Sequence, residues 1–261
     1  MTYYIHNEHH LGDNIFNMIL FYNIKDYIEN NNIFINYYCQ SRYFNQVIEF
    51  IPSKNIQLFS IDEKPKKSLQ LWINNKYFVY NHDNGDNNKI SFNNFYKIFF
   101  NIVLSKLKIP IKLKKFTYKD EDLLIRYEML NEKYKNIDIL ILNSQPLSDQ
   151  YNYNKTEWDN YIILLNTKYK IVTTTKVNNN ILCSMDDNLT IKNIAAISTN
   201  VKVVIAINSG VVPGLLNYYT LTNIKQFYIF DDRCFYSYPN FIRKRNIRNI
   251  TFQELDKYLS I

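Results

Sequence analysis

The feature that most constrains the fold is an alternation of apolar strands and helices in the second half of the chain. Ile137 to Leu142 and Val201 to Ile207 are nearly continuous apolar runs, and such runs are typical of parallel strands buried on both faces. Helices are predicted after them at 156–166 and 211–219. Because parallel strands need a crossover connection, this succession predicts βαβ units. An α/β fold is therefore expected here.

The same alternation continues in both directions along the chain. The second half predicts further strands at 169–174 and 227–230 and helices at 120–134, 190–199 and 251–259. The first half predicts strands at 2–6, 33–38 and 56–61 and helices at 13–30, 41–50 and 91–108. Residues 69–73 and 76–80 flank Asn74-Asn75 and predict a hairpin or paired edge strands.

The segment IPIKLKKFTYK, residues 109–119, predicts a connector between the two arrays. A chain of 261 residues is long enough for two such arrays, each with its own core. We therefore expect two Rossmann-like lobes, 1–118 and 119–261, with parallel sheets facing a central cleft.

The net charge of +7 raises the question of a nucleic-acid partner. The basic runs at 64–67, 112–115 and 243–248 are short and fall in predicted loops or the connector. Nucleic-acid interfaces gather such residues on one face with interleaved aromatic side chains. We expect no nucleic-acid partner, and the surplus suits an anionic substrate or solubility. A nucleic-acid-binding protein would instead show tight, steeply salt-dependent binding to bulk DNA or RNA.

Cysteine usage and hydropathy indicate the compartment. Cys39, Cys183 and Cys234 are odd in number and widely spaced, so they predict buried thiols in a reducing environment. No run is long enough to span a bilayer, and the polar residues at 6–14 do not resemble a signal peptide. The chain is expected to be cytoplasmic, with at most peripheral membrane contact.

The turn after the first predicted strand combines His9-His10-Leu11-Gly12-Asp13-Asn14, in a chain with only 4 glycines. Gly12 would allow a tight turn, and Asp13 would lie at the helix start as a cap or first-turn anion. The same position, at the carboxyl end of a strand, is where open α/β proteins carry out chemistry. A structural role and a functional role are both open at this point.

A second turn, Asn208-Ser209-Gly210-Val211, joins the strand ending at Ile207 to a predicted helix. The amides of residues 209–212 would point along the helix axis, an arrangement that binds phosphate. An ordinary helix entry, with Ser209 as cap and Gly210 for close packing, accounts for the pattern equally well.

Other polar residues follow neighbouring strands and would meet at the same sheet edge. They are Asn143 and Ser144 after one strand, Thr174 and Lys176 after the next, and Lys155 at a helix start. The loops 143–145, 173–176, 184–187 and 208–212 are therefore expected to come together. Plain turns remain an alternative for each.

These motifs, in this order, resemble the heptosyltransferase-type glycosyltransferases. The resemblance rests on the early Leu11-Gly12-Asp13 turn, the Lys155-Thr156-Glu157-Trp158 helix start and the late Asn208-Ser209-Gly210 turn. It implies the two-lobed GT-B fold, with an acceptor-side lobe over 1–118 and a nucleotide-sugar lobe over 119–261. The family's later turn often ends in histidine, and this chain has none there.

The resemblance implies a metal-independent, inverting glycosyltransferase that moves a sugar from a nucleotide-sugar donor to a glycan, lipid-linked or other hydroxyl acceptor. Asp13 would be the base, with His10 as a second candidate because imidazole side chains in general are suited to proton removal near neutral pH. Gly12 and Asn14 would lie on the acceptor side. The donor would contact the residues named above after the strands of the second lobe: Asn143, Ser144, Lys155, Thr174, Lys176, Asn208, Ser209, Gly210 and Val211.

Two other kinds of protein remain open. A non-catalytic nucleotide- or glycan-binding relative of a GT-B enzyme would share the fold without the chemistry. Asp231-Asp232 and the Asp83 to Asp86 stretch are similar to the metal-binding Asp-x-Asp of GT-A enzymes. The first lies near the C-terminus and the second in an Asn-rich loop, and the four histidines lack zinc spacing. We expect no metal and no cofactor.

Overall fold

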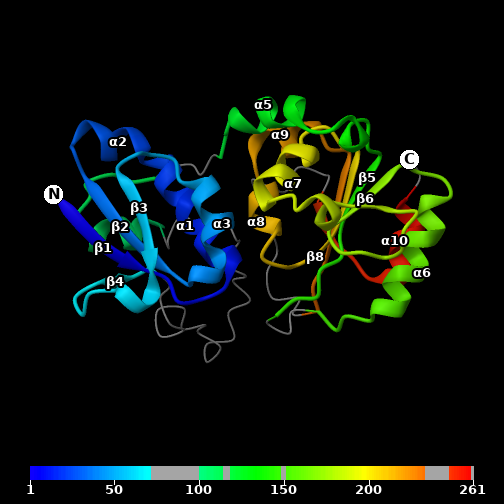
Figure 1. The fold of residues 1–261 in the computed structure, drawn as a ribbon, viewed down its shortest axis with the longest axis horizontal. Helices are drawn as coiled ribbons and strands as arrows, with labels where there is room; N and C mark the ends of the chain where they lie inside the picture. The colour runs from blue at the N-terminus through cyan, green and yellow to red at the C-terminus, as the bar shows by residue number, and fades with distance from the viewer. Residues whose placement is uncertain (72–99, 114–117, 148–150, 233–246, 260–261) are drawn as a thin grey trace, which may run out of the picture. The chain divides into compact units, whose positions relative to one another are not determined.

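The computed structural model describes residues 1–71, 100–113, 118–147, 151–232 and 247–259. The chain divides into two compact units, Met1–Tyr118 and Lys119–Ile261, drawn from blue to green and from green to red in Figure 1. Each unit is built on its own sheet. Every strand pair in the described residues is parallel, which confirms the α/β fold.

The N-terminal unit contains a four-stranded sheet of order β3-β2-β1-β4. Its strands are β1 (Thr2–His6), β2 (Phe34–Cys39), β3 (Ile56–Ser60) and β4 (Leu69–Gln70). β4 pairs with β1 in parallel, whereas the rest of the predicted hairpin around Asn74-Asn75 lies outside the described residues. The part of the predicted helix 91–108 that is described is helical from residue 100 to 106.

The helices of this unit are shorter than the sequence pattern predicts. The predicted helix 13–30 is α1 (Leu11–Asn23) followed by α2 (Lys25–Asn30), and the predicted helix 41–50 is η1 (Ser41–Tyr43), α3 (Phe44–Val47) and η2 (Ile48–Phe50). Another short turn, η3 (Ile61–Glu63), follows β3. α1 packs against α3 and η2. One face of α1 supplies buried apolar residues, including Ile15, Met18 and Ile19, at the spacing of a helix that covers a sheet.

The C-terminal unit contains a six-stranded sheet of order β10-β9-β8-β5-β6-β7. Its strands are β5 (Ile139–Leu142), β6 (Ile171–Thr173), β7 (Leu182–Cys183), β8 (Val203–Ile207), β9 (Gln226–Phe230) and β10 (Ile247–Asn249). All residues of β5, β6 and β8 are buried, as expected of central strands that are covered on both faces. The sequence pattern did not predict β7 and β10, which lie at the two edges of the sheet.

Helices cover both faces of this sheet (Figure 1). α6 (Lys155–Asn166) and α10 (Phe252–Tyr258) cover one face, and their side chains belong to one core with β5, β8 and β9. On the other face, α7 (Ile191–Ser198) packs against α5 (Asp122–Met129) and α8 (Val212–Leu215). The remaining elements are η5 (Glu132–Tyr134), η6 (Ser184–Asp187) and α9 (Tyr218–Asn223). Among the described residues, none of the helices has the length and apolar character needed to cross a bilayer.

The boundary between the units is anchored on both sides. The ring of Tyr118 packs against Tyr22 at a centroid distance of 5.2 Å and against Phe50 at 6.5 Å. Two residues later, the Asp120 carboxylate forms an ion pair with the buried Lys192 ammonium of α7 at 3.1 Å. The same ammonium lies 3.0 Å from Asp122 in α5. The end of the first unit and the start of the second are thus each packed onto their own core.

Trp158 lies at the centre of the aromatic cluster that joins α6 to the sheet and to α10. It is fully buried and contacts the rings of Phe230 and Phe252 at centroid distances of 4.8 and 5.2 Å. We expect Trp158→Ala to lower the free energy of unfolding of the C-terminal unit by about 3–5 kcal/mol, because it leaves a large cavity in the core. Urea unfolding followed by circular dichroism measures this loss.

Leu164→Ala on the same helix is the matched control, because Leu164 is 56% exposed. It should change the same free energy by less than about 1 kcal/mol. Equal losses in both variants would contradict the placement of Trp158 in the core.

Candidate functional site

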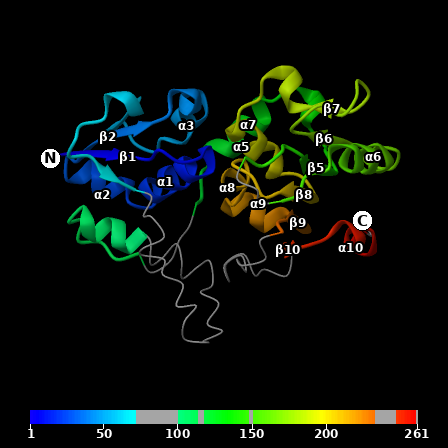
Figure 2. The same cartoon turned by 90° about the horizontal axis from the view of Figure 1, so that it is seen from below.

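In each described sheet the order of the strands reverses at one position. The connections that enter or leave the two strands on either side of that position run in opposite directions along the sheet. In the N-terminal sheet this position lies between β1 and β4, and in the C-terminal sheet between β5 and β8. Ligands of open α/β proteins bind beyond the carboxyl ends of the strands at such points. The predicted residues after β1, β5 and β8 follow the carboxyl ends of these strands in the chain, and Figure 2 labels the three strands within their units.

Asp13 lies in the first turn of α1, just after β1. The helix begins at Leu11 with His10 as its N-cap residue, and the Asp13 carboxylate accepts a hydrogen bond from the His10 backbone N–H at 3.1 Å. Burial raises the pKa of Asp13, although the His10 hydrogen bond and the nearby His9 and His10 act to lower it. A carboxylate whose pKa is raised toward the working pH suits proton transfer.

The two histidines before Asp13 differ in their surroundings. His9 is half-buried and donates its backbone N–H to the Asn7 side-chain oxygen at 2.9 Å. Burial lowers the pKa of His9, while Asp13 acts to raise it. His10 is exposed, so its imidazole is accessible to a substrate at this edge.

Gly12 and Asn14 are both buried. The Asn14 amide nitrogen donates to the backbone oxygen of His10 at 2.9 Å and of His9 at 3.4 Å. The Asn14 side-chain oxygen accepts a hydrogen bond from the Tyr37 hydroxyl at 2.8 Å. The structure therefore places the Asn14 side chain under the turn, where it holds the backbone of both histidines.

A cluster that the sequence did not point to lies beside this turn. The His6 Nδ1 atom is 2.9 Å from the Ser68 hydroxyl, and its Nε2 atom is 3.7 Å from the Glu8 carboxylate, which also pairs with Lys64. Burial and, to a smaller extent, Lys64 lower the pKa of His6. These contacts join β1 to the segment between β3 and β4, a pairing across 62 residues that no local pattern reveals.

Asn143, after β5, ties the ends of β5 and β6 together. Its side-chain oxygen accepts the backbone N–H groups of Thr174 at 3.1 Å and Thr175 at 2.9 Å, and its amide nitrogen donates to the Thr175 backbone oxygen at 3.1 Å. The hydroxyls of Ser144 and Thr174 lie 3.1 Å apart. The structure thus brings these three predicted residues together, with Asn143 buried beneath the edge.

The turn after β8 is tied to β9 in a similar way. Asn208 donates from its amide nitrogen to the buried Asp231 carboxylate at 2.6 Å. The Ser209 hydroxyl oxygen is shielded from solvent and has no hydrogen-bond partner within the described part of the chain. Gly210 and Val211 follow it, both half-buried, with Val211 as the N-cap residue of α8.

The predicted helix 211–219 is wrong in one respect, because it is two short helices. α8 spans only Val212–Leu215 and contains Pro213 in its first turn, and Asn217 then caps α9 by accepting the Thr220 backbone N–H at 2.9 Å. The Val212 N–H donates to the Ser209 backbone oxygen at 3.1 Å. Of the four amides expected to face a phosphate, the one of Val212 is therefore engaged within the turn.

The two lysines expected at this edge are in ion pairs. Lys155, the first residue of α6, pairs with Asp159 one turn later, and Lys176 lies 3.3 Å from Asp186 of η6. Both lysine side chains are more than half exposed, and exposed pairs of this kind contribute little free energy. Either lysine can therefore exchange its partner for an anionic ligand at small cost.

The aspartates considered as a metal motif hold loops instead. Asp231 binds Asn208, and Asp232 accepts the backbone N–H of Asn152 at 2.6 Å. In the described ranges, no group of three or more histidine, cysteine or acidic side chains is placed to hold a metal ion. The Asp83 to Asp86 stretch lies outside the described residues. Cys39 and Cys183 are buried free thiols, and burial raises the pKa of Cys39 to about 12.

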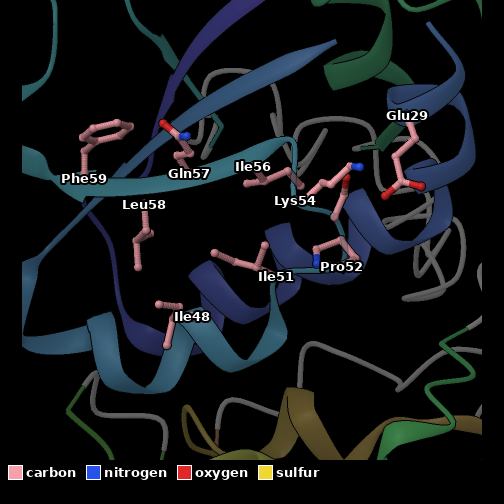
Figure 3. A pocket seen from close by; sticks show the side chains of 10 residues that line it. Glu29, Ile48, Ile51, Pro52, Lys54, Ile56, Gln57, Leu58 and Phe59 are labelled. Carbon is pink, nitrogen blue, oxygen red and sulfur yellow. The ribbon is translucent and has the colours of Figure 1, made fainter. Parts of the chain in front are cut away.

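A groove of about 760 Å³ lies along β3 at the edge of the N-terminal sheet (Figure 3). Ile48, Ile51, Ile56 and Leu58 give it an apolar wall, and Glu29 and Lys54 lie toward one end. Its lining includes none of the predicted site residues that the structure describes. The groove is therefore separate from the Asp13 turn.

Comparison with solved structures decides the type of fold. The E. coli heptosyltransferase WaaC with ADP superposes with a TM-score of 0.51 at 10% identity, over 88% of this chain and 87% of that chain. A glycosyl transferase of family 9 from Veillonella parvula gives a TM-score of 0.52 at 11% identity, over 98% and 88%. The chain has a heptosyltransferase-like glycosyltransferase fold.

The sequence itself carries little of this likeness. No protein-family model matches it, and no curated protein sequence matches it. The glycosyltransferase fold confirms the predicted two-sheet α/β class and the resemblance of the chain to heptosyltransferase-type glycosyltransferases.

The raised pKa of Asp13 predicts a pH-dependent effect on stability. As the pH rises from acid, the unfolded chain loses this proton near the ordinary pKa of 3.8, whereas the folded chain loses it later. Ionisation of Asp13 therefore lowers the free energy of unfolding above that window. We expect Asp13→Asn to be more stable than the wild type at pH 7, with the gain shrinking as the pH falls toward 4.

Urea unfolding of both proteins across this pH range measures the difference. Asparagine keeps a side-chain oxygen that can accept a hydrogen bond from the His10 N–H. The loss of this hydrogen bond therefore contributes little to the difference in the free energy of unfolding. A clear loss of stability in Asp13→Asn at pH 7 would mean that neighbouring groups stabilise the ionised carboxylate, contrary to the burial argument.

Proposed function

We propose that this protein is a metal-independent glycosyltransferase that moves a sugar, with inversion, from a nucleotide-sugar donor to a hydroxyl of a glycan or lipid-linked acceptor. The observation that carries the proposal is the half-buried Asp13 carboxylate at the carboxyl edge of the first sheet, in a chain with a glycosyltransferase fold. Rates of sugar transfer from a panel of nucleotide sugars test it directly.

In the proposed reaction the acceptor oxygen forms a bond to the anomeric carbon while the bond from that carbon to the diphosphate breaks. Asp13 takes the proton of the acceptor hydroxyl, and the nucleoside diphosphate leaves with the electron pair of the broken bond. His10, exposed and close to Asp13 in sequence, is the second candidate for the proton. Such a base typically contributes about 10²–10⁴-fold to the rate.

The C-terminal unit is the proposed donor unit, and the N-terminal unit is the proposed acceptor unit. The WaaC structure with the same fold contains ADP, which supports a nucleoside diphosphate as the leaving group here. The backbone amides of Ser209, Gly210 and Val211 would bind the diphosphate at the carboxyl end of β8. Lys155 and Lys176 would leave their carboxylate partners to neutralise it.

A second candidate function is nucleotide or glycan binding without catalysis. It is favoured by the ion pairs of both lysines and by the absence of a histidine after Asn208-Ser209-Gly210 in the sequence. Calorimetric titration with nucleotide sugars, followed by assays of transfer and donor hydrolysis, separates the two. Binding with neither transfer nor hydrolysis supports the second candidate.

Asp13→Asn should reduce sugar transfer by at least about 100-fold, because the amide cannot accept the proton. The affinity for the nucleotide should change by less than about twofold, because Asp13 belongs to the other proposed unit. Steady-state transfer rates and calorimetry measure the two quantities. Transfer at the wild-type rate would exclude Asp13 as the base and direct attention to His10.

Gly210→Val should have the opposite profile. A side chain at position 210 would intrude where the phosphate approaches the backbone, so the dissociation constant for a nucleoside diphosphate should rise at least about tenfold. Calorimetry with ADP, UDP and GDP provides this measurement. Leu164→Ala, on the exposed face of α6, serves as a control with unchanged affinity.

Unchanged affinity in Gly210→Val would remove the turn after β8 from the nucleotide site. If Asp13→Asn alone lost nucleotide binding, the donor and acceptor roles of the two units would have to be exchanged.

A further inference from the structure

Four buried polar side chains lie beneath the turn that carries Asp13. Asn7, Asn14 and Tyr37 are fully buried, and Asn17 is 1% exposed. They come from three separate places in the chain: the segment after β1, helix α1 and strand β2. A polar cluster inside a core costs free energy unless its groups are hydrogen-bonded to each other.

The hydrogen bonds of the cluster form one continuous path. Asn17 donates to the Tyr37 hydroxyl at 2.8 Å, and this hydroxyl donates to the Asn14 side-chain oxygen at 2.8 Å. Asn14 and Asn17 are three residues apart on α1, so both face the sheet. A hydroxyl has one proton to donate. Because the Tyr37 hydroxyl accepts the Asn17 amide proton, its own proton goes to the Asn14 oxygen, and the direction of the path is fixed.

The path continues outward to the Asp13 turn. Asn14 donates from its amide nitrogen to the backbone oxygens of His9 and His10, and the His10 N–H donates to the Asp13 carboxylate. From below, Asn7 accepts the backbone N–H of His9. The backbone of both histidines is thus held by buried side chains, and Asp13 is held by that backbone.

The cluster is not fully satisfied within itself. The Asn17 side-chain oxygen is shielded from solvent and has no hydrogen-bond partner among the described residues. Such a group costs free energy, because its lost hydrogen bonds to water are not replaced. Burial raises the pKa of Tyr37 well above its ordinary value, so its hydroxyl keeps its proton and remains a donor. A purely structural contact between helix and sheet would be served better by apolar side chains.

We propose that Tyr37 is a positioning residue for Asp13, because through Asn14 its hydroxyl fixes the His9-His10 backbone that holds the carboxylate. This inference rests on the proposed role of Asp13 as the base. The alternative is that the cluster only anchors α1 to the sheet. The two differ in what they alter: positioning affects kcat and the surroundings of the histidines, whereas anchoring affects stability alone.

Tyr37→Phe tests the proposal, since it removes a single oxygen atom and keeps the ring, which packs edge-on against Phe21 at 6.0 Å. Tyr38→Phe is the matched control. It is the same substitution one position along β2, where side chains alternate between faces, and the Tyr38 ring stacks on Phe59 at 5.3 Å.

We expect Tyr37→Phe to lower kcat for transfer at least about tenfold, with KM for the donor changed by less than about twofold. Tyr38→Phe should leave both within about twofold of the wild type. Asn14→Leu should resemble Tyr37→Phe, and the double variant should be little worse than either single variant, because both remove the same path.

A readout that does not need activity is the imidazole signals of His9 and His10 in nuclear magnetic resonance. They should move in Tyr37→Phe and stay in place in Tyr38→Phe. Unchanged histidine signals in Tyr37→Phe, or a kcat equal to that of Tyr38→Phe, would overturn the proposal.

Failure of the proposed function has a different signature. If the wild-type protein transfers no sugar but the histidine signals move in Tyr37→Phe, the positioning of the turn stands and the glycosyltransferase assignment falls. If transfer is found and the signals and kcat do not respond to Tyr37→Phe, the assignment stands and Tyr37 is a structural residue.

Discussion

Parallel pairing of the strands is the constraint on which the rest of this structure depends. It forces each connection to return to the amino end of the sheet, so that helices cover the faces and polar turns collect at the carboxyl ends. Asn143, Thr174 and Asn208 are separated by tens of residues in the chain and meet at one edge for this reason alone. The Asp13 turn occupies the equivalent edge of the other sheet.

The central strands and the fold class could be predicted from the sequence, because an uninterrupted apolar run such as Ile139–Leu142 is typical of a strand buried on both faces. The edge strands of the second sheet could not be predicted in this way. β7 and β10 have two and three residues, too few to carry a periodic pattern. The predicted helix after Gly210 is too long, because the break between α8 and α9 depends on the non-helical backbone of Leu216 and on the Asn217 cap rather than on hydropathy.

The candidate site shows the same division. A carboxylate or a glycine that comes shortly after a predicted strand is a local signal. Asp13 and Gly210 could therefore be selected from the sequence. The partners of Lys155 and Lys176, and the contact of His6 with Ser68, depend on tertiary structure. Tyr37 could not be selected from the sequence for a further reason. The chain contains 23 tyrosines, so the presence of a tyrosine at one position does not indicate a function. Its buried hydrogen bonds with Asn14 and Asn17 make it a candidate.

The chain is anchored on both sides of the unit boundary. Tyr118 is packed onto the first unit and Asp120 is held by Lys192 of the second, so only Lys119 separates two fixed points. The backbone thus passes from one core to the other within a single residue, and two separately packed bodies are joined there without a linker segment of their own.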